Sequence, residues 1–81
     1  MHTPKLTTLC EVIAQDWTNM HYAAVPYFEA MQTLNSLSEN YILDSGKSIA
    51  LYFLANAQTW RGPVARQVKA DLKQLIKEVN S

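Results

Sequence analysis

Cysteine, glycine and proline are scarce in this chain of 81 residues, which contains one, two and three of them, respectively. A single cysteine, Cys10, excludes an internal disulfide and a thiol-rich zinc site. Chain-breaking residues are few, strand-like alternation is weak, and apolar residues recur at spacings of three and four. The sequence therefore predicts an all-α fold, a compact bundle of four helices with no sheet, as a single helical domain over residues 1–81.

No apolar run is long enough to cross a membrane. The longest, residues 49–57, is interrupted by Asn56, whereas a membrane-spanning helix needs about 20 apolar residues. The first residues also lack the basic patch, apolar core and cleavage site of a signal peptide. We therefore expect a soluble, cytoplasmic protein with no membrane partner.

The first helix is expected to begin with Thr3 as its cap and Pro4 in its first position, because proline lacks the N–H that would be unpaired there. Its apolar stripe consists of Leu6, Leu9, Cys10, Ile13 and Trp17. It is expected to end near residues 18–19.

The second helix depends on Pro26, which can begin a helix or kink one that starts near Asn19. The conformation of residues 18–25 stays open for this reason. The expected apolar face consists of Tyr27, Ala30, Met31, Leu34 and Leu37. Residues 38–46 have the composition of a connection, in which Tyr41, Ile42 and Leu43 are expected to turn inward.

The third helix is expected over residues 45–60 and is unusually apolar. Its main apolar sector, about 140° wide, consists of Ile49, Ala50, Phe53, Leu54, Ala57 and Trp60. Leu51, Tyr52 and Ala55 fall outside this sector. A helix that is apolar around most of its circumference is either central in the bundle or covered by a second chain.

The fourth helix follows a clean break at residues 61–63, since glycine can end one helix and proline can open the next. One sector of it carries Val64, Val68, Leu72, Leu75, Ile76 and Val79, and beside that sector lies a basic flank of Arg66, Lys69, Lys73 and Lys77. Charge is divided along the chain, because residues 1–60 have a net charge of −3 and residues 61–81 have +3.

Gly46-Lys47-Ser48 resembles the end of a phosphate-binding loop, but the earlier glycine that such a loop requires is replaced by Tyr41 and no parallel sheet is expected. The tripeptide is better interpreted as a helix start, capped by the side chain of Ser45 or Asp44.

Other candidates for chemistry are also weak. Cys10 and His21 would lie about 16 Å apart on one helix, and Cys10 belongs to the apolar stripe, where cysteine is usually inert. His2 and His21 have no suitably spaced acid for a metal site, and no pair of carboxylates indicates acid–base catalysis. We expect no catalytic residue, no cofactor, no metal and no enzyme activity.

Two surfaces remain as candidates for binding. The leading hypothesis is a non-catalytic protein-interaction module that self-associates, most simply as a dimer, through the apolar third helix, with Leu51, Tyr52, Trp60 and Arg61 at the contact. A different protein partner would use the same surface. The alternative is a small nucleic-acid-binding regulator that uses the basic residues Arg61, Arg66, Lys69, Lys73 and Lys77.

Overall fold

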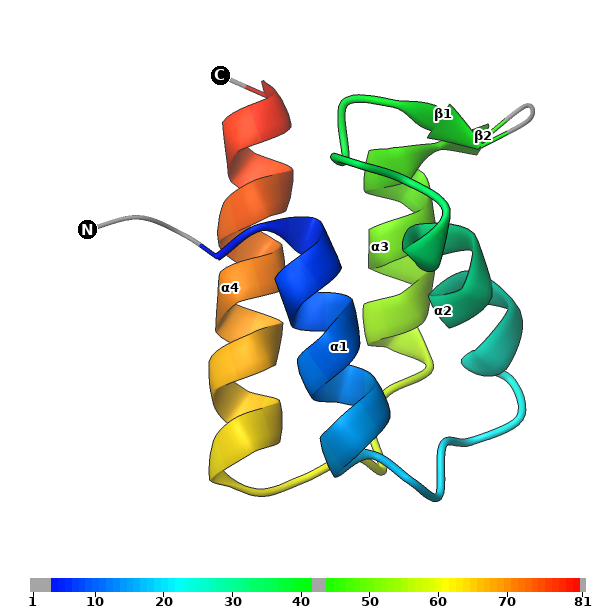
Figure 1. Cartoon of the computed structure of the whole chain (residues 1–81), viewed down its shortest axis with the longest axis vertical. Coiled ribbons are helices and arrows are strands. Elements are labelled where there is room, and N and C mark those ends of the chain that lie inside the picture. The colour runs from blue at the N-terminus through cyan, green and yellow to red at the C-terminus, as the bar shows by residue number, and fades with distance from the viewer. Residues whose placement is uncertain (1–3, 42–43, 81) are drawn as a thin grey trace.

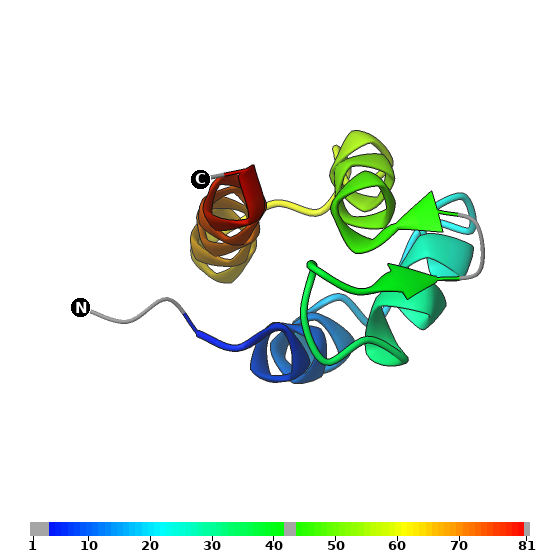
Figure 2. The same cartoon turned by 90° about the horizontal axis from the view of Figure 1, so that it is seen from above.

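The computed structural model describes residues 4–41 and 44–80. In this part of the chain the elements are α1 (Leu6–Asp16), α2 (Val25–Gln32), β1 (Asn40–Tyr41), β2 (Asp44–Ser45), α3 (Gly46–Ala55) and α4 (Pro63–Asn80) (Figure 1). Seen from above, the four helices stand around a common centre in chain order, so that α4 returns to the side of α1 (Figure 2). The most extensive packing joins α1 to α4 and α2 to α3.

The expectation that the fold has no sheet is wrong. Two short strands pair in an antiparallel hairpin, with Asn40 opposite Ser45 and Tyr41 opposite Asp44. Strands of two residues are too short to produce an alternating pattern in the sequence. For this reason, the sequence predicts a connection without strands over residues 38–46. The hairpin reverses the chain directly before α3 begins. Tyr41 is half-buried, whereas the inward turn expected of Ile42 and Leu43 lies outside the described residues.

The apolar stripe of α1 is confirmed, because all five of its residues are buried. The start of the helix differs from the prediction. Lys5, in extended backbone conformation, is the N-cap residue and offers no side-chain cap, so Pro4 lies before the helix and not in its first position. The proposed Thr3 cap lies outside the described residues. Helix ends are set by weak local preferences, and such shifts are common.

Pro26 begins a helix and does not kink one. It is the second residue of α2, and residues 21–25 before it form turns closed by backbone hydrogen bonds from Ala24 N–H to His21 O and from Val25 N–H to Tyr22 O. Four of the five predicted apolar positions are buried, and Tyr27 is half-buried. Leu34 and Leu37 occupy the loop after the helix, which ends at Gln32.

Helix α3 is shorter than predicted, because it ends at Ala55 instead of Trp60. Asn56 closes it: the Asn56 backbone N–H reaches both Tyr52 O and Phe53 O, and its side-chain Nδ2 donates to Tyr52 O at 2.9 Å. Asparagine often ends helices, since its side chain competes for backbone carbonyls. The predicted apolar sector is nevertheless buried except for Leu54, which is half-buried.

The break before α4 is confirmed. Gly62 has φ +112°, a conformation that favours glycine, and Pro63 is the first residue of α4. The predicted apolar sector is partly wrong, because Val64 and Val79 are 38% and 39% exposed while Ala65 is buried. The buried face of α4 therefore includes Ala65 and leaves Val64 and Val79 at its edge.

Gly46-Lys47-Ser48 is a helix start, as predicted. The Ser45 Oγ accepts the Ser48 backbone N–H at 3.1 Å, which caps α3. Gly46 is buried, and its N–H donates to Glu39 O at 2.8 Å. A Cβ at Gly46 would lie 2.8 Å from Leu37 O and 2.9 Å from Glu39 O. The glycine is thus needed for close backbone approach and not for holding phosphate.

This close approach predicts that Gly46→Ala destabilises the fold. The loop over residues 37–39 would have to move away from α3, at a cost of about 1–3 kcal/mol in the free energy of unfolding. Chemical denaturation followed by circular dichroism measures that cost. Unchanged stability would show that the loop does not constrain α3.

Candidate interaction surfaces

The outer face of α3 is apolar and exposed. Leu51 and Tyr52 are 45% and 50% exposed, and Ala55 is exposed beside them. The Tyr52 ring packs against the ring of Tyr27 from α2, with 5.4 Å between ring centroids. Lys47, in the first turn, is the one charged residue of α3. We call Tyr27, Leu51, Tyr52 and Ala55 the α3 outer face.

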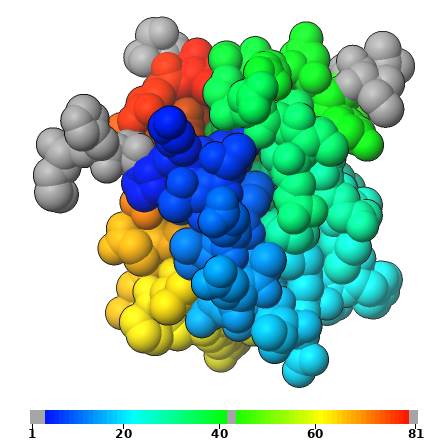
Figure 3. Space-filling model, viewed as in Figure 1, coloured from blue at the N-terminus to red at the C-terminus, as the bar shows by residue number. Residues whose placement is uncertain are grey.

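Helix α3 stands across the bundle from α1 (Figure 2). On the opposite side, α1 covers the middle of the surface, between α4 and the segment formed by α2 and its following loop (Figure 3). The apolar surplus predicted for the third helix is therefore divided. Most of it enters the core, and Leu51 and Tyr52 remain outside.

Trp60 does not belong to the exposed surface, although it was expected near a contact. It is 3% exposed, and its ring stacks on that of Trp17 with 5.5 Å between centroids and 7° between planes. Its Nε1–H donates to Asp16 Oδ2 at 2.8 Å. The turn after α3 carries Trp60 onto the end of α1, so its ring is not available to a partner.

The connection from α3 to α4 brings three basic side chains together. Arg61, Arg66 and Lys69 line one shallow pocket with Trp60, Gly62 and Ala65. Lys69 Nζ donates to the backbone oxygen of Trp60 at 2.6 Å. Burial lowers the pKa of Lys69, and the positive charges of Lys73 and Arg61 lower this pKa further. The sequence grouped Arg61 with Arg66 and Lys69 as candidate nucleic-acid contacts, and the fold brings these three residues to one pocket.

The acidic residues of α4 are separated from these cations. Asp71 lines a groove between α1 and α4 that also includes Val12, Val64 and Gln67. It accepts a hydrogen bond from Gln67 Nε2 at 3.0 Å, and Glu78 accepts one from Gln74 Nε2 at 3.3 Å. One edge of α4 is thus basic and faces the α3–α4 connection, while the edge toward α1 is acidic.

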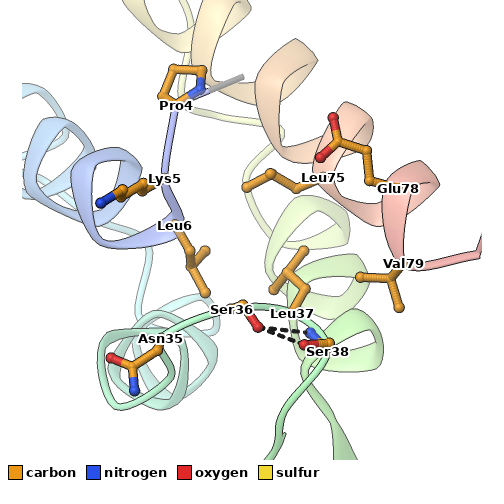
Figure 4. A pocket seen from close by; sticks show the side chains of 10 residues that line it. All are labelled: Pro4, Lys5, Leu6, Asn35, Ser36, Leu37, Ser38, Leu75, Glu78 and Val79. Atoms are coloured by element: carbon orange, nitrogen blue, oxygen red, sulfur yellow. Dashed lines mark hydrogen bonds between the residues drawn. The ribbon is translucent and has the colours of Figure 1, made fainter. Parts of the chain in front are cut away.

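Sequence reasoning missed a groove between the start of α1, the loop after α2 and the end of α4 (Figure 4). Leu6, Leu37, Leu75 and Val79 form its apolar walls. The side chain of Lys5 points away from it, and Ser36 and Ser38 bond to each other through their hydroxyls at 2.6 Å. No long-range sequence signal links these three segments, which meet only through the fold.

The arrangement of Cys10 and His21 does not activate a nucleophile. Cys10 is buried, and burial raises the pKa of its thiol to about 11. His21 is exposed, and its Nδ1 accepts the backbone N–H of Ala23 at 3.1 Å. Among residues 4–41 and 44–80, no three His, Cys, Asp or Glu side chains are placed to hold a metal ion. Likewise, no described helix is both long and apolar enough to span a bilayer.

Comparison with protein-family models, with curated proteins and with solved structures finds no match to this chain.

The packing of Trp60 predicts a measurable coupling with Asp16. Trp60→Phe keeps an aromatic ring but removes the N–H donor to the carboxylate, and it should lower the free energy of unfolding by about 1–2 kcal/mol. A double-mutant cycle with Asp16→Ala isolates the hydrogen bond, because the second substitution should cost little once the first is made. Additive effects of the two substitutions would contradict the bond.

The raised pKa of Cys10 predicts a slow thiol. At pH 8 an ordinary cysteine is partly ionised, so a pKa of about 11 should slow reaction with a disulfide reagent such as DTNB by about two orders of magnitude. Denatured protein serves as the control and should react at the ordinary rate. Because the pKa is raised, the native rate should increase as the pH rises toward 11. A fast native reaction at pH 8 would contradict the burial.

Proposed function

We propose that this protein is a non-catalytic interaction module that self-associates as a dimer through the α3 outer face. The observation that carries the proposal is the half-exposed pair Leu51 and Tyr52 on a helix with no charged residue after its first turn. Tyrosine and large aliphatic residues exposed side by side are typical of protein interfaces, where they lose contact with water on binding.

The geometry favours a symmetric, weak dimer. A helix of ten residues is about 15 Å long, so a contact confined to this face and to Tyr27 is smaller than the interface of a permanent dimer. Two copies related by a two-fold axis would place α3 against α3, and each Leu51 would pack near the partner copy's Tyr52. Lys47, at one end of the helix, would stay at the rim in such an arrangement.

Arg61 is exposed but belongs to the basic pocket, so we assign it to that surface and not to the dimer contact. The absence of catalysis is supported by the inert setting of Cys10. A cytoplasmic location is supported by the same residue, since a lone buried thiol suits a reducing compartment.

A nucleic-acid-binding role for the basic flank does not compete with self-association. Its residues lie on α4 and on the connection before it, whereas the contact uses α3 and Tyr27. Both activities can belong to one molecule.

Sedimentation equilibrium tests the dimer. The weight-average mass of the wild-type protein should rise from the 9.2 kDa of one chain toward twice that value at high micromolar concentration. Leu51→Asp should weaken association at least about tenfold, because a desolvated carboxylate at the contact costs more than 1.4 kcal/mol. Since Leu51 is half-exposed, the variant should remain folded, which circular dichroism checks.

Tyr22→Ser is the matched control. Tyr22 is 83% exposed and lies in the connection between α1 and α2, so removal of this aromatic ring should leave association unchanged. A wild-type protein that stays monomeric over the whole concentration range would overturn the proposal.

A further inference from the structure

The strongest concentration of charge lies where the α3–α4 connection meets α4. Arg61, Arg66 and Lys69 line one pocket, and Lys73 is close enough to Lys69 to shift its pKa. For the described part of the chain, the structure records no ion pair between these four cations and an acidic side chain. Within residues 4–41 and 44–80, four positive charges therefore lie together without an acidic side chain paired to them.

Lys69 is the cation whose surroundings the structure defines in most detail. Its ammonium group donates to Trp60 O at 2.6 Å, and the residue is half-buried. Burial is the main cause that lowers the pKa of Lys69, and the positive charges of Lys73 and Arg61 lower this pKa further. A bound anion would reverse this, because it would neutralise the repulsion between Lys69, Lys73 and Arg61. The local arrangement thus favours an anionic ligand, although the net charge of the chain is zero. The local charges matter more than this net charge, because exposed charges more than about 10 Å apart are largely screened from one another at 0.1 M salt.

The cations also form a row. From Arg66 through Lys69 and Lys73 to Lys77, the exposed or half-exposed basic side chains follow one edge of α4 over eleven residues, or about 16 Å. The acids Asp71 and Glu78 are engaged by Gln67 and Gln74 and do not interrupt this edge. A row of this length matches a ligand with repeated negative charges better than a single phosphate group.

The aromatic residue that lines the basic pocket cannot stack on nucleic-acid bases. Trp60 lines the pocket, but its ring is stacked on Trp17 and is 3% exposed. Proteins that prefer single strands stack bases on exposed aromatic rings. The pocket presents basic side chains but no accessible aromatic ring. Such side chains bind phosphate groups of a nucleic-acid backbone, and these contacts carry no base specificity.

We infer that Arg61, Arg66, Lys69 and Lys73, extended by Lys77, bind the phosphate backbone of a nucleic-acid duplex without regard to base sequence. This inference goes beyond the proposed self-association and does not require it.

Fluorescence anisotropy with labelled DNA duplexes of two unrelated sequences, each of about 20 base pairs, tests the inference. We assume that Arg61, Arg66, Lys69 and Lys73 each neutralise one phosphate. A plot of the logarithm of the binding constant against the logarithm of the salt concentration should then have a slope of about −3.6. This slope corresponds to about a 150-fold loss of affinity between about 50 and 200 mM salt. The two sequences should bind equally well, and single-stranded DNA should bind no more tightly.

The test variant is the double substitution Arg66→Gln and Lys73→Gln. Both side chains are exposed, so the fold should be preserved. With two cations removed, the slope should fall to about −1.8, or about a 12-fold loss over the same salt range. Lys5→Gln is the matched control, because Lys5 is an exposed cation directly before α1 and not part of the basic row on α4, and it should leave the slope unchanged.

Three outcomes would overturn the inference. One is the absence of duplex binding at about 50 mM salt. The second is equal loss of affinity in the Lys5→Gln control and in the double variant, because binding would then be a general charge effect. The third is binding of polyglutamate as tightly as DNA, which would assign the site to an acidic protein. Repeating the titration with Leu51→Asp separates this result from the fate of the dimer.

Discussion

The stack of Trp60 on Trp17 fixes the connection between α3 and α4 against the end of α1. The two rings are nearly parallel, with 5.5 Å between their centroids. Trp60 Nε1–H also donates a hydrogen bond to Asp16, which is 44 residues away in the sequence. Trp17 also packs edge-on against Phe53 of α3 at 6.0 Å. A single aromatic cluster thus joins α1, α3 and the turn that leads into α4.

The basic surface follows from the same cluster. With its ring inserted in the core, Trp60 presents its backbone oxygen to Lys69, and the next residue, Arg61, is brought beside Arg66. Ordering a long, charged side chain costs conformational entropy, and a carbonyl acceptor at 2.6 Å offsets part of this cost for Lys69. A structural residue of the core therefore determines where the cations of the connection lie.

The end of α3 at Ala55 also determines which apolar side chains are buried and which stay exposed. Since the helix stops at Ala55, the chain can turn and bury Ala57 and Trp60 without a longer helix extending beyond α1. Leu51 and Tyr52 remain on the outer side of α3, where the packing of α2 and α4 does not cover them fully. The buried face of α3 and its exposed apolar face are thus two sides of one apolar helix.

Much of the core could be predicted from periodicity, because a side chain at a spacing of three or four necessarily shares a helix face with its neighbour. The α1 stripe, the cap at Ser45 and the break at Gly62 are local features of this kind, and the structure confirms them. The pairing of β1 with β2 was not predictable in this way. Its strands are two residues long, and its place depends on the approach of the loop over residues 37–39 to Gly46.

The sequence by itself determined which residues are apolar, where α3 and α4 begin, and that cations follow one flank of the last helix. Only the tertiary structure decided that the Trp60 ring is stacked on Trp17 and buried, and that Arg61, Arg66 and Lys69 line one pocket. The physical reason is the range of the interactions. Helix propensity and capping act over about four residues, whereas burial of an aromatic ring depends on partners that the fold brings together from distant parts of the chain.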